Sequence, residues 1–285
     1  MALLVTRAAG LVTVQDRGRS GFAHLGVPRA GALDRPAADL ANRLVGNDPG
    51  AAVLESTVLG ITFTTDRALT FAVTGASCPV TVDGRHRAHG EPVTARAGAL
   101  VELGAVTSGV RTYLAVSGGV DVAPVLGSRS TDTLAWVGPA RVEAGATLPV
   151  GRPGRPRPVD TVAIDRRRGP LGLLPGPRLD WFADGVWATL TSAPYVVSGD
   201  ADRVGLRLRG ATLTRSRVDE LPSEGMVVGA VQVPPDGHPV VLLADHPTTG
   251  GYPVIGVVDE EDLARCAQLR PGDEVRFTAR EAATG

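Results

Sequence analysis

The chain has 285 residues, of which 43% are hydrophobic and 21% charged, and its formal net charge is −1 at pH 7. These values predict a soluble globular protein of one or two domains, and they indicate neither a nucleic-acid partner nor an acidic membrane surface. All 29 basic residues are arginine. This chain can therefore form no lysine Schiff base, carry no lysine-linked biotin and supply no P-loop lysine.

The two cysteines, Cys78 and Cys266, lie far apart in the sequence. This spacing excludes a disulfide framework or a CxxC zinc site and predicts a cytoplasmic location. Arg7 and Gly10 interrupt the apolar run at the N-terminus, so we expect no signal peptide. No window reaches the roughly 18 apolar residues that a membrane span needs.

The 36 glycines and 22 prolines favour a turn-rich, mainly β fold. Short apolar runs bounded by glycine, proline or aspartate predict the strands. In chain order these runs cover residues 11–16, 60–65, 68–73, 79–84, 99–103, 111–118, 195–200, 229–233, 239–244 and 274–277. Strands of this length and spacing are typical of sandwiches and barrels.

Two helices interrupt the strands. Asp34 is the expected N-cap of the first, which covers about residues 36–46, and Asp259 that of the second, which Pro271 and Gly272 end. Residues 151–162 are rich in proline, arginine and glycine without periodicity, so they predict a linker. We therefore expect one β domain over residues 1–150 and another over 163–285.

A repeat supports two related domains. Three short motifs of the first half recur in the same order in the second. The pairs are Arg19–Gly26 with Arg203–Gly210, Glu55–Gly60 with Glu224–Gly229, and Arg96–Val101 with Arg270–Val275.

Polar side chains gather beside glycines in the first half. Gln15, Asp16 and Arg19 follow the strand at residues 11–16, and Asp34 comes shortly after them. An arginine there could bind a carboxylate or phosphate through two parallel hydrogen bonds. Equally, Asp16 and Arg19 could pair with each other and pin a loop. Arg111, on a later strand, is a further candidate for substrate binding.

A second polar group occupies the segment from residue 223 to residue 256. The stretch from Asp245 to Tyr252 joins two apolar runs, so it could be an ordinary turn or a ligand-binding loop. With Glu224 and Gln232 it offers carboxylates, an amide and hydroxyls that could orient a lactam or a carboxylated amide.

These patterns give a set of candidate site residues. The predicted catalytic residues are Asp16, Arg19, Glu224, Asp245 and Tyr252, and the predicted substrate-binding residues are Gln15, Asp34, Arg111, Gln232, Thr248, Thr249 and Gly250. No metal site is assigned, because the pair His86 and His89 lies between Gly84, Gly90 and Pro92, which predict a solvated turn.

Several of these segments together resemble one known family. They are residues 13–34, 40–48, 125–133, 198–210, 222–256 and 263–277. The family is the biotin-dependent carboxyltransferase family, also called allophanate hydrolase subunit 2 or KipA-like, which includes the C component of 5-oxoprolinase. The resemblance covers about residues 8–278 and implies two cyclophilin-like β-barrel domains.

The resemblance also implies a function. It implies one subunit of an ATP-dependent 5-oxoprolinase, which opens 5-oxo-L-proline to L-glutamate. The implied partners are the KipI-like B component and the LamB/YcsF-like A component of that enzyme. ATP would be used by the assembled complex, and no biotin would be attached to this chain. Two alternatives stay open: a carboxyltransferase component of a urea carboxylase/allophanate hydrolase system, and a non-catalytic regulator that binds a KipI-type inhibitor of a histidine kinase.

Overall fold

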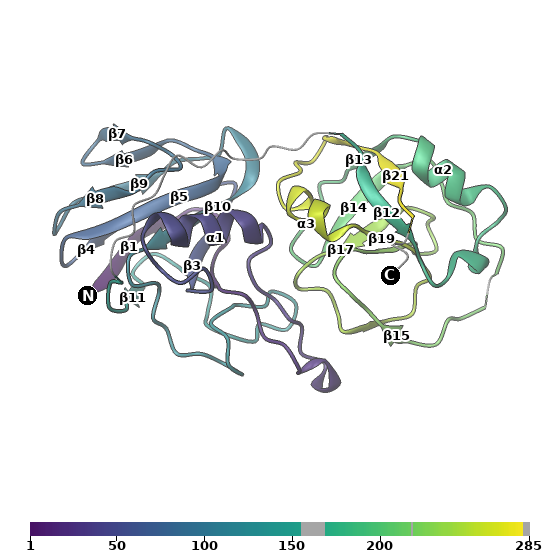
Figure 1. Ribbon diagram of the computed structural model, residues 1–285, viewed down its shortest axis with the longest axis horizontal. Helices are drawn as coiled ribbons and strands as arrows, with labels where there is room; N and C mark the ends of the chain where they lie inside the picture. Colours follow the sequence, from purple (N-terminus) through teal and green to yellow (C-terminus); the bar gives the residue numbers. More distant parts are fainter. Residues whose placement is uncertain (155–168, 218, 282–285) are drawn as a thin grey trace. The chain divides into compact units, whose positions relative to one another are not determined.

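A computed structural model describes residues 1–154, 169–217 and 219–281 of the chain (Figure 1). By their contacts the residues form two compact units. The first comprises Met1–Ser20 and Ala30–Ile164, and the second comprises Gly21–Arg29 and Asp165–Gly285. From residue 155 onward the predicted linker lies outside the described residues, and the domain boundaries at 150 and 163 stay predictions. No helix among the described residues is long and apolar enough to cross a membrane.

The first unit contains two antiparallel sheets. One has the order β11 (Thr147–Pro149), β1 (Ala2–Ala8), β4 (Ile61–Thr65), β9 (Val101–Leu103), β6 (Val80–Val82) and β7 (Arg85–Arg87). The other has the order β2 (Val12–Gln15), β3 (Val53–Thr57), β10 (Ser108–Val116), β5 (Leu69–Ser77) and β8 (Val93–Ala95).

One apolar core includes residues from both sheets. Alternate residues of β1 are buried, among them Leu3 and Val5, as the period of two along a strand requires. Phe63 of β4 and Phe71 of β5 meet edge to face, with ring centroids 6.2 Å apart. Burying each such ring stabilises the fold by roughly 1.5–3 kcal/mol.

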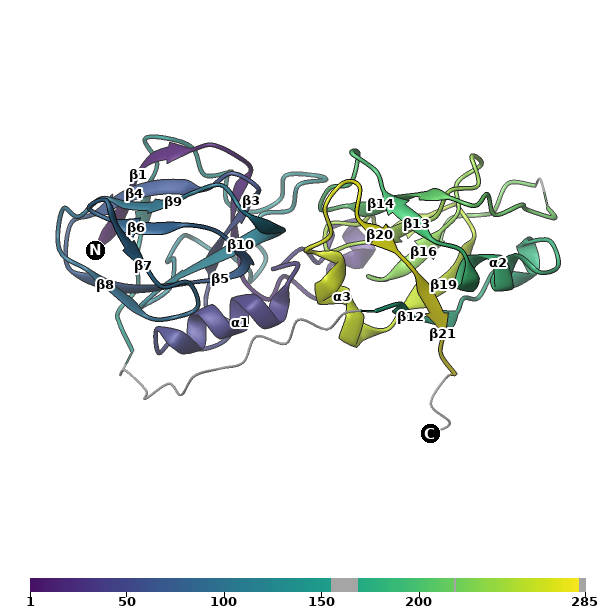
Figure 2. The same ribbon diagram turned by 90° about the horizontal axis from the view of Figure 1, so that it is seen from above.

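Helix α1 (Arg35–Leu44) covers one face of the second sheet, beside β5 and β10 (Figure 2). The Asp34 side chain accepts a hydrogen bond from the backbone N–H of Ala37 at 3.0 Å, which confirms the predicted N-cap. Leu40 and Leu44 lie in a buried cluster with Tyr113 of β10. The helix therefore places the start of its segment, at Asp34, next to the buried Tyr113 of this sheet.

The second unit is a nearly closed barrel. Its eight-stranded sheet has the order β20 (Glu274–Val275), β13 (Tyr195–Val197), β14 (Gly205–Gly210), β17 (Val240–Leu242), β16 (Ala230–Gln232), β19 (Val254–Val258), β12 (Leu171–Pro175) and β21 (Phe277–Ala279). Only Arg276 separates β20 from β21, although these strands stand at opposite ends of the sheet order. The sheet must therefore curve back on itself.

Short elements complete this barrel. Helix α3 (Glu260–Cys266) begins at the predicted N-cap Asp259, whose side chain accepts from the N–H of Glu261 at 3.2 Å. Helix α2 (Val186–Ser192) follows Gly185, which has no capping side chain, so the sequence contained no start signal for it. Strands β15 (Glu224–Gly225) and β18 (Thr249–Gly250) form a separate two-stranded ribbon. The mainly β fold class is confirmed.

The third repeat motif forms the same turn in both units. The N–H of Ala99 donates to the carbonyl of Arg96 at 3.1 Å, and that of Asp273 donates to the carbonyl of Arg270 at 3.0 Å. The other two motifs differ locally. For example, Glu55 lies in the middle of strand β3, whereas Glu224 lies in the ribbon.

Candidate functional site

In the first unit, the Asp16 carboxylate joins two loops. It accepts hydrogen bonds from the hydroxyls of Ser128 and Ser130 at 2.6 Å each, from the N–H of Arg129 at 2.6 Å and from the N–H of Gly18 at 2.8 Å. Both carboxylate oxygens are thus engaged. The arrangement gives Asp16 a positioning role, and its predicted catalytic role stays a prediction.

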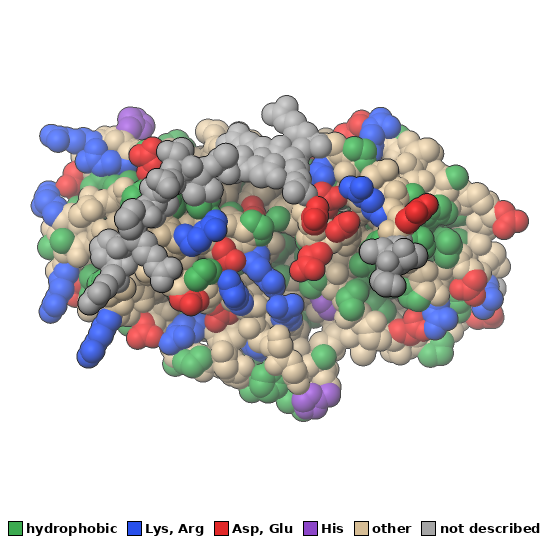
Figure 3. All heavy atoms as spheres, in the orientation of Figure 1, with side chains coloured by type: hydrophobic (Ala, Val, Ile, Leu, Met, Phe, Trp, Pro, Cys, Tyr) green, Lys and Arg blue, Asp and Glu red, His purple; other side chains and the backbone are tan. Residues whose placement is uncertain are grey.

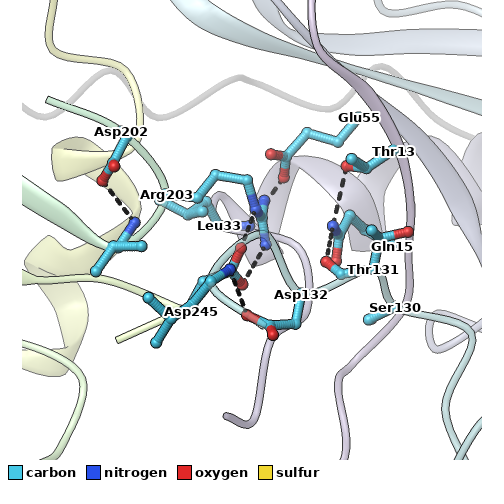
Figure 4. A network of polar contacts seen from close by, with 12 residues as sticks. Thr13, Gln15, Leu33, Glu55, Ser130, Thr131, Asp132, Asp202, Arg203 and Asp245 are labelled. Carbon is cyan, nitrogen blue, oxygen red and sulfur yellow. Dashed lines mark hydrogen bonds and ion pairs between the residues drawn. The ribbon is translucent and has the colours of Figure 1, made fainter. Parts of the chain in front are cut away.

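Gln15 and Arg19 are held by the same serine-rich loop. The Gln15 side chain is fully buried, and its Nε2 donates to the Thr13 hydroxyl at 2.9 Å and to the Thr131 carbonyl at 2.8 Å (Figure 4). Its Oε1 is buried and has no hydrogen-bond partner in the described part of the chain. Arg19 is also buried and donates through Nη2 to the carbonyl of Ser130.

Glu55 on β3 forms a second buried group that sequence reasoning missed. Its carboxylate accepts from the N–H of Leu33 at 3.1 Å and from the Tyr113 hydroxyl at 2.9 Å, and Arg111 Nε lies 3.6 Å away. The Tyr113 hydroxyl accepts in turn from the N–H of Asp34 at 2.7 Å. Burial, with the nearby charges of Glu55 and Asp34, raises the pKa of Tyr113 well above its usual value, so the hydroxyl stays protonated. The sequence feature that could have revealed this group is the single acidic residue, Glu55, within an apolar run.

In the second unit, Asp245 forms a buried ion pair with Arg203. Arg203 Nε lies 2.8 Å from Oδ2 and Nη2 lies 3.0 Å from Oδ1 (Figure 4). The two side chains are 0% and 1% exposed. Such a forked pair tolerates burial because each charge is matched by the other. Asp245 therefore supports the barrel, while a catalytic role for it stays a prediction.

His246, the next residue, is also buried. Its Nδ1 donates to the carbonyl of Pro247 at 2.7 Å, because a carbonyl can only accept. Burial lowers the pKa of His246, although the hydrogen bond and the neighbouring Asp245 act in the opposite direction. The ring is therefore neutral at pH 7.

Gln232 lies against the ribbon that β15 and β18 form. Its Nε2 is 3.2 Å from the Met226 sulfur and donates to the Tyr252 carbonyl at 3.3 Å. A Cβ on Gly250 would lie 2.7 Å from this Nε2, so only glycine leaves room for the amide. The structure thus brings together three predicted residues, Gln232, Gly250 and Tyr252.

The remaining predicted residues of this unit lie along the ribbon. Glu224 is opposite Gly250 in the strand register, Thr249 is exposed, and the Thr248 carbonyl accepts from the N–H of Met226 at 2.9 Å. Thr248 therefore contributes its backbone to the ribbon. The substrate-binding roles of these residues stay predictions.

Two arginines that sequence reasoning missed flank the ribbon. Arg178 forms a forked ion pair with Glu224, in which Nε lies 3.1 Å from Oε2 and Nη2 contacts Oε1. The Arg215 guanidinium lies over the Tyr252 ring at 5.8 Å from its centroid. Both come from turn-rich segments with no pattern around them, so the sequence offered no signal for either.

The two units differ in what their polar groups can do. In the first, most of the predicted residues belong to buried networks that orient loops. In the second, Tyr252 is 45% exposed and lies beside an amide and a guanidinium, a combination of groups that suits a planar polar ligand. No group of three or more metal-ligating side chains occurs in residues 1–154, 169–217 and 219–281. His86 lies in the exposed edge strand β7, where the sequence predicted a turn.

Comparison with known proteins identifies the family. Residues 25–279 match the family described as carboxyltransferase domain, subdomain A and B, and the chain belongs to it. The chain is 39% identical to the C component of 5-oxoprolinase from Escherichia coli K12, over 96% of this chain and 90% of that protein.

Two solved structures have the same fold. TTHA0988 matches with a TM-score of 0.88 and 40% identity, over 97% of this chain and 55% of that chain. The urea amidolyase of K. lactis matches with a TM-score of 0.92 and 27% identity, over 98% of this chain and 19% of that chain. The chain therefore spans about half of the first structure and about a fifth of the second.

We predict that the buried ion pair is required for folding. Asp245→Asn should lower the free energy of unfolding by about 3–5 kcal/mol, because it removes the negative charge from a buried, forked ion pair. Urea unfolding of the single and double variants measures this. Replacing both residues, as Arg203→Met with Asp245→Leu, should restore much of the loss. An Asp245→Asn protein with the stability of the wild type would show that the pair does not support the barrel.

We also predict that His246 makes stability fall in mild acid. Its pKa is lower in the folded state than the value of 6.5 that it has when unfolded. The unfolded chain therefore binds the proton more readily, and stability is lost as the pH falls below about 6.5. Thermal unfolding between pH 7 and pH 5 should show a flatter dependence for His246→Asn, whose amide can still donate to Pro247. His86→Asn, on the exposed strand β7, is the control and should keep the slope of the wild type.

Proposed function

We propose that the chain is one subunit of an ATP-dependent 5-oxoprolinase, a hydrolase that opens 5-oxo-L-proline to L-glutamate. The observation that carries the proposal is the match to the E. coli protein, at 39% identity over 90% of its length. A second 5-oxoprolinase C component, from Haemophilus influenzae, is 32% identical over 94% of this chain. Because the match covers nearly the full length of both proteins, it supports the same function for the whole of this chain.

The chemistry of the second unit supports a lactam as ligand. Opening a lactam requires a bound planar N–C(=O) group, polarised so that water can attack its carbon. The Gln232 amide and the Arg215 guanidinium offer hydrogen-bonding groups beside the exposed ring of Tyr252. The ring supplies a flat apolar surface on which a five-membered lactam can lie.

The proposal includes partners. We propose that this chain acts with the KipI-like B component and the LamB/YcsF-like A component of 5-oxoprolinase in the cytoplasm. ATP is then a substrate of the assembled complex, and no P-loop of this chain binds it, because the chain contains no lysine. ATP would supply the free energy for opening the lactam. For the same reason the chain can carry no biotinyl-lysine.

A carboxyltransferase function is the alternative. The TM-score of 0.92 with the K. lactis urea amidolyase favours it, because that protein has the same fold over nearly this whole chain. Both functions need a bound planar amide, so the fold alone does not discriminate them. The substrate discriminates them, because one reaction consumes 5-oxoproline and the other carboxylates urea.

We expect glutamate release to require the assembled complex. The chain and its KipI-like and LamB/YcsF-like partners should together convert 5-oxo-L-proline and ATP to glutamate, and omission of any one should abolish the product. Size-exclusion chromatography should show this chain eluting with the KipI-like partner. Glutamate formation without this chain would contradict the proposal. ATP-dependent carboxylation of urea in the presence of a biotin-carrying protein would favour the alternative, as would a lack of any reaction with 5-oxoproline.

Within that assay, we predict that Gly250→Ala impairs the reaction. The added methyl would displace the Gln232 amide, and misplacement of a binding group by about 1 Å can cost roughly 100-fold in rate. We therefore expect kcat/KM for 5-oxoproline to fall roughly 10- to 100-fold. Gly225→Ala is a matched control in the same ribbon, because nothing lies within 4 Å of its added Cβ. Equal effects of the two substitutions would contradict a role for the amide.

A further inference from the structure

Arg215 differs from many arginines of the second unit in its surroundings. Six others form ion pairs with carboxylates: Arg178 with Glu224, Arg203 with Asp245, Arg209 with Asp236, Arg217 with Asp180, Arg265 with Asp262, and Arg276 with Glu274. Arg215 has no carboxylate partner among the described residues. A half-buried cation without a counter-ion can attract an anionic ligand.

The Arg215 side chain is nevertheless held in place. Its Nη2 donates to the carbonyl of Val233, and the guanidinium stacks on the Tyr252 ring at 5.8 Å. The Nε is buried without a partner in the described residues, whereas Nη1 has no partner there and is not buried. Partial removal from water lowers the pKa of Arg215, while Tyr252 acts in the opposite direction. The group is therefore positioned, and its free donors are at Nη1.

Gln232 presents the complementary group around the same tyrosine. Its Nε2 must face the Tyr252 carbonyl, because that oxygen can only accept. The other end of the amide is therefore the acceptor Oε1, which has no hydrogen bond within the described residues and is not buried. Arg215 and Gln232 both contact Tyr252, one on its ring and the other on its carbonyl. An open cationic donor and an open acceptor thus lie around one residue.

We propose that Arg215 binds the carboxylate of the lactam substrate while Gln232 Oε1 accepts its ring N–H. This inference rests on the proposed function. In 5-oxo-L-proline the carboxylate is on the carbon next to the ring nitrogen, so an anion and an N–H donor stand side by side. The ring itself lies on Tyr252, and the lactam carbonyl, on the other side of the ring nitrogen, makes neither of these two contacts. The site then selects lactams that carry an α-carboxylate.

The test compares two lactams on the assembled complex. Arg215→Gln should raise the KM for 5-oxo-L-proline roughly 10- to 100-fold, since it removes a hydrogen bond between two charged groups. The kcat should change much less. The inhibition constant of 2-pyrrolidinone, the same ring without the carboxylate, should stay unchanged. Arg215→Lys keeps the charge without the planar fork, and we expect a smaller rise in KM.

Arg217→Gln is the matched control. Arg217 also stacks on an aromatic ring, Trp181, at 5.6 Å, but it already has Asp180 as its partner. Arg217→Gln should leave both the KM for 5-oxo-L-proline and the inhibition constant of 2-pyrrolidinone unchanged. The inference is overturned if Arg215→Gln keeps the KM of the wild type, or if it weakens both lactams equally, which would indicate a structural role. A wild-type complex that releases no glutamate would overturn the proposed function itself, and that result is read from the wild-type arm alone.

Discussion

The candidate site of the second unit depends on one side-chain amide. Gln232 links the ribbon to the strand that carries it, through the Met226 sulfur and the Tyr252 carbonyl. The contact exists only because Gly250 has no side chain. The Arg215 guanidinium lies over the ring of the same Tyr252. The Gln232 amide and the Arg215 guanidinium thus meet at one residue, Tyr252.

Several charged residues in this protein hold loops or strands in place. Asp16 engages both of its oxygens with a serine-rich loop, and Asp245 is buried against Arg203. Both were predicted to be catalytic from their polar surroundings. A carboxylate that is already satisfied by several donors is well placed to orient a loop and has less capacity to move protons. The residue type alone therefore does not tell whether an aspartate positions a loop or takes part in catalysis.

The sequence predicted the elements better than the roles of their side chains. The helix caps at Asp34 and Asp259 are local hydrogen bonds, so residue type and spacing were enough to find them. The strands around the hairpin turn at residues 234–238 were predictable for the same reason. Helix α2 was missed, because its start at Gly185 has no capping side chain.

The site was predicted only in part. Gln232, Gly250 and Tyr252 were found because they lie in one polar, glycine-rich motif. Arg178 and Arg215 were not, since their partners are about 40 residues away in sequence and no periodic pattern marks them. In the first unit, Glu55 was missed as a polar centre because strand propensity dominates its surroundings. Long-range pairing is the information that a single sequence lacks.

One exposed edge strand carries positive charge. Strand β7 ends one sheet of the first unit and consists of two arginines around His86, all exposed. Figure 3 shows basic side chains gathered on the part of the first unit that carries β6 and β7. Positive charge along an open edge disfavours pairing with the edge of a second molecule. The low net charge of the whole chain conceals this local concentration.

The barrel of the second unit has a consequence for folding. Its strand β12 pairs in parallel with β21, so that Leu171 lies opposite Phe277, far away in the sequence. A pairing of this kind forms late, because a long loop must close before the two strands can meet. Until then both edges of the future seam carry unpaired backbone groups, to which a strand of another molecule could bind. The step that closes the barrel is thus also the step that protects it from aggregation.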